Sequence, residues 1–189
     1  MSNPFVEKIC EAIYDRSDPI SFSTLDSRIL NLLKANPQNP KNLKIYYIQS
    51  SLGVSIIECC LKFDLKKCTK FLLELDININ SIYRYGESSL CFCIKNLSFK
   101  CAKLLISYEA KVNQKQMWGL TSLHYAASYG KIKFLKYLIL RGGDVYIQNS
   151  AGRTVIDFIN DDADKKEILE YIDELTLIKP NIKIKLKVL

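Results

Sequence analysis

The feature that most constrains the fold of this chain is a regular spacing of glycines. Gly53, Gly86, Gly119 and Gly152 recur at one constant interval, and they are four of only seven glycines. Two further columns keep the same interval: a hydroxyl residue two places after each glycine (Ser55, Ser88, Thr121 and Thr154) and an aliphatic residue two places later (Ile57, Leu90, Leu123 and Ile156). A period in the range of about 20 to 50 residues is typical of supersecondary units that stack in a row. The spacing therefore predicts a repeat array.

Each unit carries the signals of two helices and a loop. A Ser or Thr that opens an apolar stretch is a typical N-cap, because its hydroxyl accepts a hydrogen bond from a backbone N–H of the first helical turn. The later segment KIKFLKYLILRGG, at 131–143, brings four apolar side chains to one helical face: Ile132, Leu135, Leu138 and Ile139. Gly142 and Gly143 then end that helix. The pattern predicts helix, turn, helix and protruding loop, repeated along the chain.

The unit GLTSLHYAASYGKIKFLKYLILRGGDVYIQN resembles an ankyrin repeat. It matches the signature G-x-T-P-L-H-x-A-A-x-x-G, except that Ser122 replaces the proline. The match is strongest over 117–149, extends into the segment NSAGRTVIDF, and stays in register over 50–82 and 83–116. The resemblance implies an all-α ankyrin-repeat solenoid with units of about 33 residues.

The ends of the chain do not follow the repeat. Residues 1–47 lack the pattern but contain two amphipathic helix candidates, at 3–16 and 23–35, with Asn3-Pro4 and Ser23/Thr24 as start signals. We interpret this segment as a divergent N-terminal helical cap, since a terminal unit must shield one end of the stack. The expected organisation is then a cap at 1–47, repeats over 48–176 (50–82, 83–116, 117–149 and 150–176), and an extended tail at 177–189.

The tail is rich in lysine and alternates between apolar and basic residues. It holds four of the lysines in a chain whose formal net charge is +7, so the rest of the protein is only mildly basic. Period-two alternation is typical of a half-buried strand. The tail is expected to lie as an extended arm on the last repeat. Alternatively, it adds to the sheet edge of a partner, or its lysines meet phosphates or anionic lipid.

The single histidine, His124, is the residue that could suggest an enzyme. A lone His beside hydroxyls is a candidate general base. In the ankyrin signature, however, this histidine opens the first helix and bonds to the Thr hydroxyl and to the backbone of the neighbouring repeat. Its equivalents in the other units are Glu58, Cys91 and Asp157, and no residue is placed to complete a catalytic triad. We expect a structural role and no catalytic residue.

The cysteines and a run of acids are the other candidates for chemistry. Most of the seven cysteines fall in repeat columns that hold Ala126 or Phe134 in the best-matched unit, which predicts buried free thiols. Zinc sites usually pair their ligands as C-x2-4-C, a pattern that is missing here. The acidic run NDDAD at 160–164 lacks the length of a calcium loop and is expected to cap a helix. No metal and no cofactor is predicted.

A partner is expected on the concave face of the array, which the loop tips and first helices form. The resemblance implies that partner-reading positions flank each repeat glycine and the end of the first helix. Carried onto this chain, they predict binding residues at Arg84, Tyr85, Lys95, Met117, Trp118, Leu120, Tyr129 and Arg153. Trp, Tyr and Arg are enriched among residues that dominate binding energy.

The leading hypothesis is a non-enzymatic protein–protein interaction module, acting as an adaptor, inhibitor or scaffold subunit. The alternative is a nucleic-acid or anionic-surface binder that uses the lysine-rich tail. The N-terminus has no secretory h-region, and no apolar stretch reaches the ~20 residues of a membrane span, so a cytoplasmic monomer is expected, with the nucleus as a second location. Richness in Ile, Lys, Asn and Tyr suggests an AT-rich genome, where such proteins often act on host factors.

Overall fold

The described part of the chain is built from helices. The computed structural model describes residues 4–14, 22–35, 55–75, 77–80 and 86–178. Within these ranges there are nine α-helices and no strand: α1 (Pro4–Tyr14), α2 (Phe22–Lys34), α3 (Ile56–Lys62), α4 (Lys66–Glu74), α5 (Ser89–Lys95), α6 (Phe99–Ser107), α7 (Ser122–Ser128), α8 (Ile132–Leu140) and α9 (Asp162–Ile178). Two short 3-10 turns, Met117–Gly119 and Ile156–Phe158, lie before α7 and before α9.

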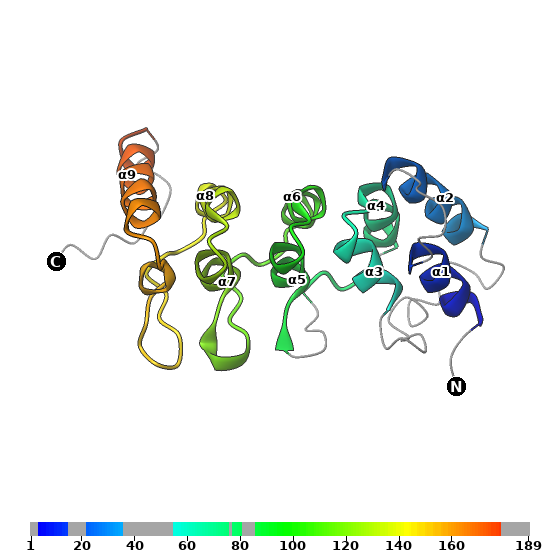
Figure 1. The fold of residues 1–189 in the computed structure, drawn as a ribbon, viewed down its shortest axis with the longest axis horizontal. Coiled ribbons are helices and arrows are strands. Elements are labelled where there is room, and N and C mark those ends of the chain that lie inside the picture. Colours follow the sequence, from blue (N-terminus) through cyan, green and yellow to red (C-terminus); the bar gives the residue numbers. More distant parts are fainter. Residues whose placement is uncertain (1–3, 15–21, 36–54, 76, 81–85, 179–189) are drawn as a thin grey trace.

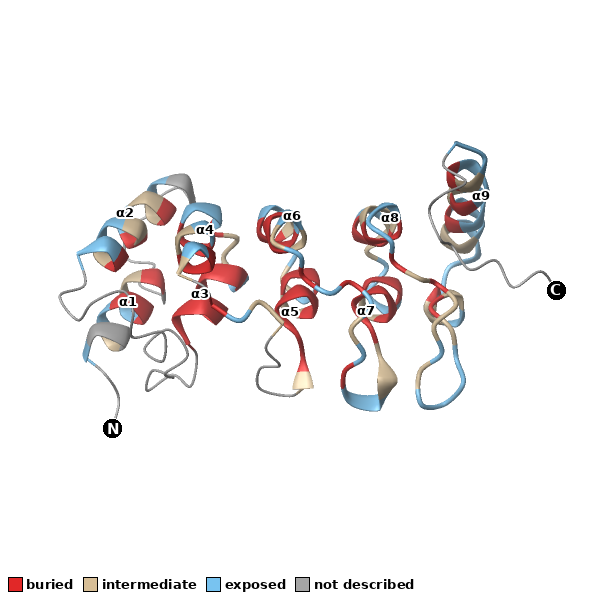
Figure 2. Ribbon diagram, turned by 180° about the vertical axis from the view of Figure 1, so that it is seen from behind, coloured by how far each residue is buried: buried red, intermediate tan, exposed pale blue. Residues whose placement is uncertain are grey.

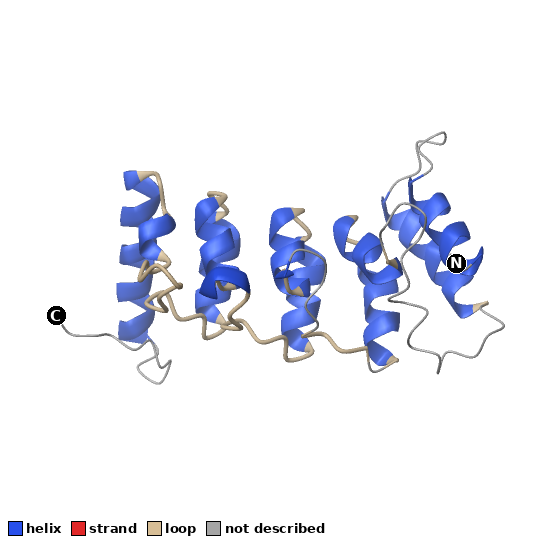
Figure 3. Cartoon of the chain, turned by 90° about the horizontal axis from the view of Figure 1, so that it is seen from below, coloured by secondary structure: helices blue, strands red, loops and turns tan. Residues whose placement is uncertain are grey.

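The helices form two rows along the long axis of the molecule (Figure 1). The first row is α1, α3, α5 and α7, and the second is α2, α4, α6, α8 and α9. Neighbours within a row pack together, as α3 does on α5 and α5 on α7. Seen from below, the helix pairs stand side by side (Figure 3). The expected all-α solenoid is confirmed, and α1 and α2 continue its two rows at the N-terminal end.

The repeated apolar columns form a core that runs through the stack (Figure 2). Leu72, Leu105 and Leu138 are at most 1% exposed, although each belongs to a different repeat. Burying such a side chain stabilises the folded state by roughly 1.5–3 kcal/mol. Each unit thus gains its stability by covering the apolar face of the next one.

Most of the predicted helix starts are present. Ser55, Ser88 and Thr121 are the N-caps of α3, α5 and α7. The expected start at Ser23/Thr24 is wrong, because α2 begins at Phe22 and places both hydroxyl residues inside its first turn.

Aspartates of the preceding unit cap two helices of the second row. Asp26 of α2 accepts hydrogen bonds from the backbone N–H groups of Lys67 and Cys68, at 2.8 and 2.9 Å, in the first turn of α4. Asp64 accepts them from Lys100 and Cys101 in α6, at 3.3 and 2.7 Å. These carboxylates bond α2 to α4, and the turn after α3 to α6.

The last repeat departs from the pattern of the others. Its first helix is reduced to the 3-10 turn Ile156–Phe158, so the N-cap predicted at Thr154 is wrong. Asp161 caps α9 instead, because its Oδ1 accepts the Asp164 N–H at 2.9 Å. The capping role predicted for the acidic run is therefore confirmed. Helix α9 continues to Ile178, past the expected start of the tail, and residues 179–189 lie outside the described part of the chain.

Candidate partner-binding surface

The turn before α7 is held from inside the protein by Gln116. This side chain is 8% exposed, and its Oε1 accepts the Ser88 N–H at 2.9 Å while its Nε2 donates to Cys91 Sγ. Its own backbone N–H donates to the Leu120 carbonyl at 2.8 Å and closes the turn. Gln116, the last residue of the unit 83–116, thereby fixes both the turn that follows it and the helix start of its own unit.

The neighbouring loops hold the same turn from both sides. A Cβ atom added to Gly86 would meet Met117 Cβ at 3.2 Å, so the two loops are in close contact. On the other side, the Ser150 N–H donates to the Trp118 carbonyl at 2.9 Å. Gly119 has a φ of +68°, and an added Cβ would lie 2.9 Å from the nitrogen of Ser150, so this position needs glycine. The turn at 117–119 is therefore in contact with Gly86 on one side and with Ser150 on the other.

Large side chains project from this fixed turn into solvent. Trp118 is 70% exposed and Met117 is 48% exposed. Trp118 adopts a φ of +63°, a left-handed conformation that is uncommon for a bulky residue. Tyr129, at the other end of α7, is 43% exposed, and its ring lies 6.3 Å from that of Tyr125. Burial raises the pKa of Tyr125 to about 12.

Two exposed basic residues were also predicted to bind, and each contacts a neighbour in its own repeat. Lys95 forms an ion pair with Glu87 at 3.0 Å, and Glu87 is itself almost buried. The guanidinium of Arg153 lies 4.4 Å from the centre of the Phe158 ring. We call the exposed Lys95, Met117, Trp118, Tyr129 and Arg153, with the half-buried Leu120, the finger surface. Arg84 and Tyr85, also predicted to bind, lie outside the described residues.

His124 has the scaffold role predicted for it. The Thr121 N–H donates to its Nδ1 at 3.1 Å, so the ring proton is on Nε2, which donates to the Arg153 carbonyl at 3.4 Å. The ring also packs edge-on against Phe158. Burial lowers the pKa of His124, which keeps the imidazole neutral.

The cysteines of the described residues are buried, as predicted, and all seven are thiols that form no disulfide. Burial raises the pKa of Cys91 to about 11 and that of Cys93 well above its usual value. These thiols are therefore protonated at neutral pH, which disfavours both nucleophilic attack and metal binding. Within the part of the chain that the structure describes, no three His, Cys, Asp or Glu side chains converge as metal ligands do.

Sequence patterns did not indicate the role of Gln116. The residue lies outside the columns that define the repeat, and the group it serves is 28 residues earlier, at Ser88. The sequence indicated only that an acceptor was missing. Cys91 occupies the histidine column, and because its sulfur accepts a backbone N–H poorly, another residue had to accept the Ser88 N–H.

The comparisons with known proteins agree with this architecture. A sequence model of the ankyrin repeats, in three copies, matches residues 56–149. No curated protein sequence matches the chain. No helix within the described ranges is long and apolar enough to cross a membrane. Ankyrin repeats are generally non-enzymatic protein–protein interaction modules. This chain belongs to the ankyrin repeat family, as shown by the matched repeats, the two-row helical stack and the histidine that joins Thr121 to the next repeat.

Proposed function

We propose that this protein is an adaptor, inhibitor or scaffold subunit that binds a partner protein through the finger surface and performs no catalysis. The observation that carries the proposal is the 70% exposure of Trp118 on a turn that is hydrogen-bonded to Ser150 on one side and, through Gln116, to Ser88 on the other. An exposed tryptophan supplies a large contact area, and a fixed backbone reduces the entropy that is lost on binding. Leaving such a side chain in water has no benefit for folding.

The surroundings of Trp118 favour a protein over a small molecule. Met117 and Trp118 give the finger surface exposed apolar area, while the exposed Lys95 and Arg153 give it positive charge. Protein interfaces typically combine an apolar centre with a polar rim. Arg84 and Tyr85 would enlarge this surface and are best tested by their own variants.

Affinity purification with the full chain and with Trp118→Ala tests the proposal. The wild type should retain a stoichiometric protein partner, and Trp118→Ala should weaken its binding by about 2 kcal/mol, roughly 30-fold in Kd. The melting temperature should stay unchanged, because the side chain is mostly in solvent. Leu169→Ala on α9, where the leucine is 40% exposed, serves as the matched control and should bind normally.

Two outcomes would contradict the proposal. One is a partner that binds Trp118→Ala as tightly as the wild type. The other is co-purification of nucleic acid with a steep loss of affinity as salt rises, which would favour the lysine-rich tail as the binding element.

A further inference from the structure

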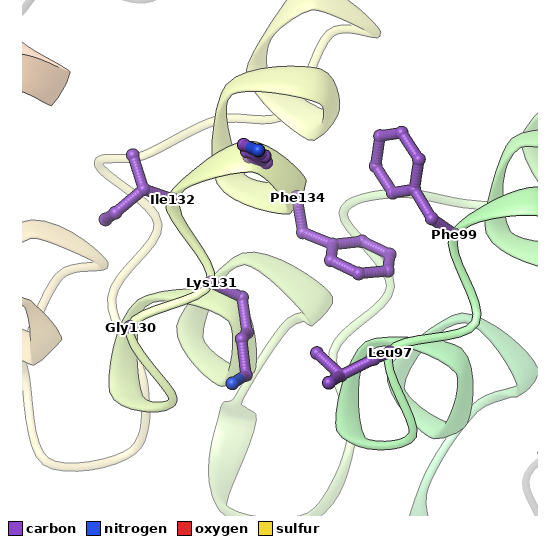
Figure 4. A pocket seen from close by; sticks show the side chains of 7 residues that line it. Leu97, Phe99, Gly130, Lys131, Ile132 and Phe134 are labelled. Carbon is purple, nitrogen blue, oxygen red and sulfur yellow. The ribbon is translucent and has the colours of Figure 1, made fainter.

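A second candidate binding site lies at the far end of α7 from the loop tips. The turn between α5 and α6 and the turn between α7 and α8 enclose a cavity of about 520 Å³. Its lining is mostly apolar and comes from both turns: Leu97, Phe99, Gly130, Lys131, Ile132, Lys133 and Phe134. We call it the turn pocket. Figure 4 shows Phe134 between Leu97 and Phe99, whose side chains border the open space.

Helices α6 and α8, whose first turns border the pocket, pack less closely than α4 and α6 do. Phe99 and Phe134 bridge the gap with an edge-to-face contact, their ring centres 4.7 Å apart. Leu97 does not close the remaining space, since its side chain is 58% exposed. The result is an apolar recess that is open to solvent.

Leu97 occupies a position at which the other repeats carry a different chemistry. It stands one full repeat after Asp64 and one full repeat before Gly130, and all three residues have a positive φ, between 53° and 61°. Asp and Gly tolerate this left-handed conformation, whereas a leucine is strained in it. For folding alone, a strained and exposed leucine is a poor choice at this position.

With Leu97 where the preceding repeat has Asp64, the N-terminus of α8 also lacks the negatively charged cap that α6 has. The Asp64 carboxylate caps α6, but Leu97 cannot cap α8, and no described side chain accepts the backbone N–H of Lys133 or Phe134. Lys131 and Lys133 line the same pocket, and no acidic residue does. The pocket is therefore apolar at its centre and positively charged at its rim, which is complementary to an acidic, apolar ligand.

From this complementarity we propose that the turn pocket binds a short segment of a partner protein in which a bulky apolar residue stands beside Asp or Glu. The apolar side chain fills the recess against Leu97, Phe99 and Phe134. The carboxylate lies by Lys131 and Lys133 and accepts the free N–H groups of α8, as Asp26 and Asp64 do in α4 and α6. This site goes beyond the proposed function, because it does not use the finger surface.

Selection from a library of displayed random peptides, with the full chain as bait, tests this proposal. The selected peptides should share an acidic residue next to Leu, Ile, Phe or Trp, and exchanging that acid for its amide should weaken binding at least tenfold. In a ¹H–¹⁵N spectrum, the amide signals of Lys133 and Phe134 should shift when a selected peptide is added.

The decisive variant is Leu97→Asp. It rebuilds the internal cap and removes the strain, so it should raise the melting temperature by about 2–4 °C while weakening peptide binding at least tenfold. If the substitution instead weakened binding by disrupting the fold, the melting temperature would fall. Leu169→Asp introduces the same charge on α9 and should leave the affinity for the peptide unchanged. Trp118→Ala, on the finger surface, should also leave this affinity unchanged.

Three results would overturn the proposal: a library that yields no binder, binders that lack the acidic and apolar pair, or Leu97→Asp binding as tightly as the wild type. If Trp118→Ala alone abolishes peptide binding, the peptide occupies the finger surface. That result would reject the turn pocket and support the proposed function.

Discussion

At the scale of single residues, one requirement of the repeat is met by four different side chains. The backbone N–H of the Ser or Thr that stands two residues after each repeat glycine needs an acceptor. Glu58 accepts it from Ser55 at 2.8 Å, His124 from Thr121 at 3.1 Å, and Asp157 from Thr154 at 2.7 Å. In the remaining unit, where the column holds a cysteine, Gln116 supplies the acceptor from the next loop. The backbone N–H is therefore satisfied in all four units, although the column itself supplies the acceptor in only three of them.

The role of His124 predicts how stability changes with pH. The folded state holds the imidazole neutral and lowers its pKa below the usual value of 6.5, so the unfolded chain binds a proton that the folded one excludes. The free energy of unfolding should therefore fall as pH drops below about 6.5. Denaturant titrations across pH 5 to 8 measure this loss.

The control is His124→Gln, which keeps an acceptor for Thr121 but does not titrate. Because His124 is the only histidine of the chain, the slope between pH 5 and 6.5 should be largely removed in this variant. A slope that is unchanged in His124→Gln would contradict the assignment. Asp157, whose pKa is lowered by its hydrogen bonds to Thr154, contributes only at lower pH.

At the scale of secondary structure, the clearest departure from the repeat is α9. By the register of the repeat it would begin near Lys165, the equivalent of Ile132 in α8, but it begins at Asp162. Asp161 supplies the cap for this early start. The preceding segment forms only the 3-10 turn Ile156–Phe158. The start of α9 therefore follows the local cap and not the period of the array.

Asp161→Ala should therefore destabilise the protein by about 1 kcal/mol, the usual cost of removing an N-cap acceptor. Asp162→Ala removes the same charge from the adjacent residue without removing the cap, and it should cost only a few tenths of a kcal/mol. Chemical denaturation of the two variants under one buffer condition provides the measurement. Equal losses would mean that charge near the helix dipole, and not the cap, is what matters.

At the scale of the whole molecule, each unit is stabilised by its contacts with the neighbouring units. The apolar core runs along the stack from one helix pair to the next, so each pair depends on its neighbours. The N-terminal helices α1 and α2 pack on α3 and α4, and the Asp26 carboxylate, 7% exposed, bonds the two groups together. This end should open as a unit, because its hydrogen bonds to α4 are concentrated on Lys67 and Cys68 in the first turn of that helix.

Asp26→Ala should destabilise the chain by about 1–3 kcal/mol, because it leaves two N–H groups of α4 without an acceptor. Hydrogen exchange should accelerate most in α1, α2 and α4 and least in α8 and α9. Asp26→Asn retains one acceptor oxygen and should show a smaller effect. Uniform acceleration along the stack would instead indicate a fully cooperative molecule.

Much of this architecture follows from the sequence alone. The glycine period, the apolar faces and the hydroxyl N-caps at Ser55, Ser88 and Thr121 are local signals, because each depends on spacing within a single unit or from one unit to the next. The same register predicted a structural role for His124 and a partner-binding position at Trp118. What repeats in the sequence could be predicted because every copy faces the same physical requirement.

The tertiary structure decided the features that break the repeat. Gln116 serves Ser88, which is 28 residues away, and Leu97 borders a pocket whose opposite wall begins at Gly130. Neither relation has a signature in the sequence, since it arises only when separate turns are brought together in space. A buried N–H takes whichever acceptor lies nearest in the folded chain, and an exposed leucine becomes a candidate binding residue only when its neighbours leave a recess beside it.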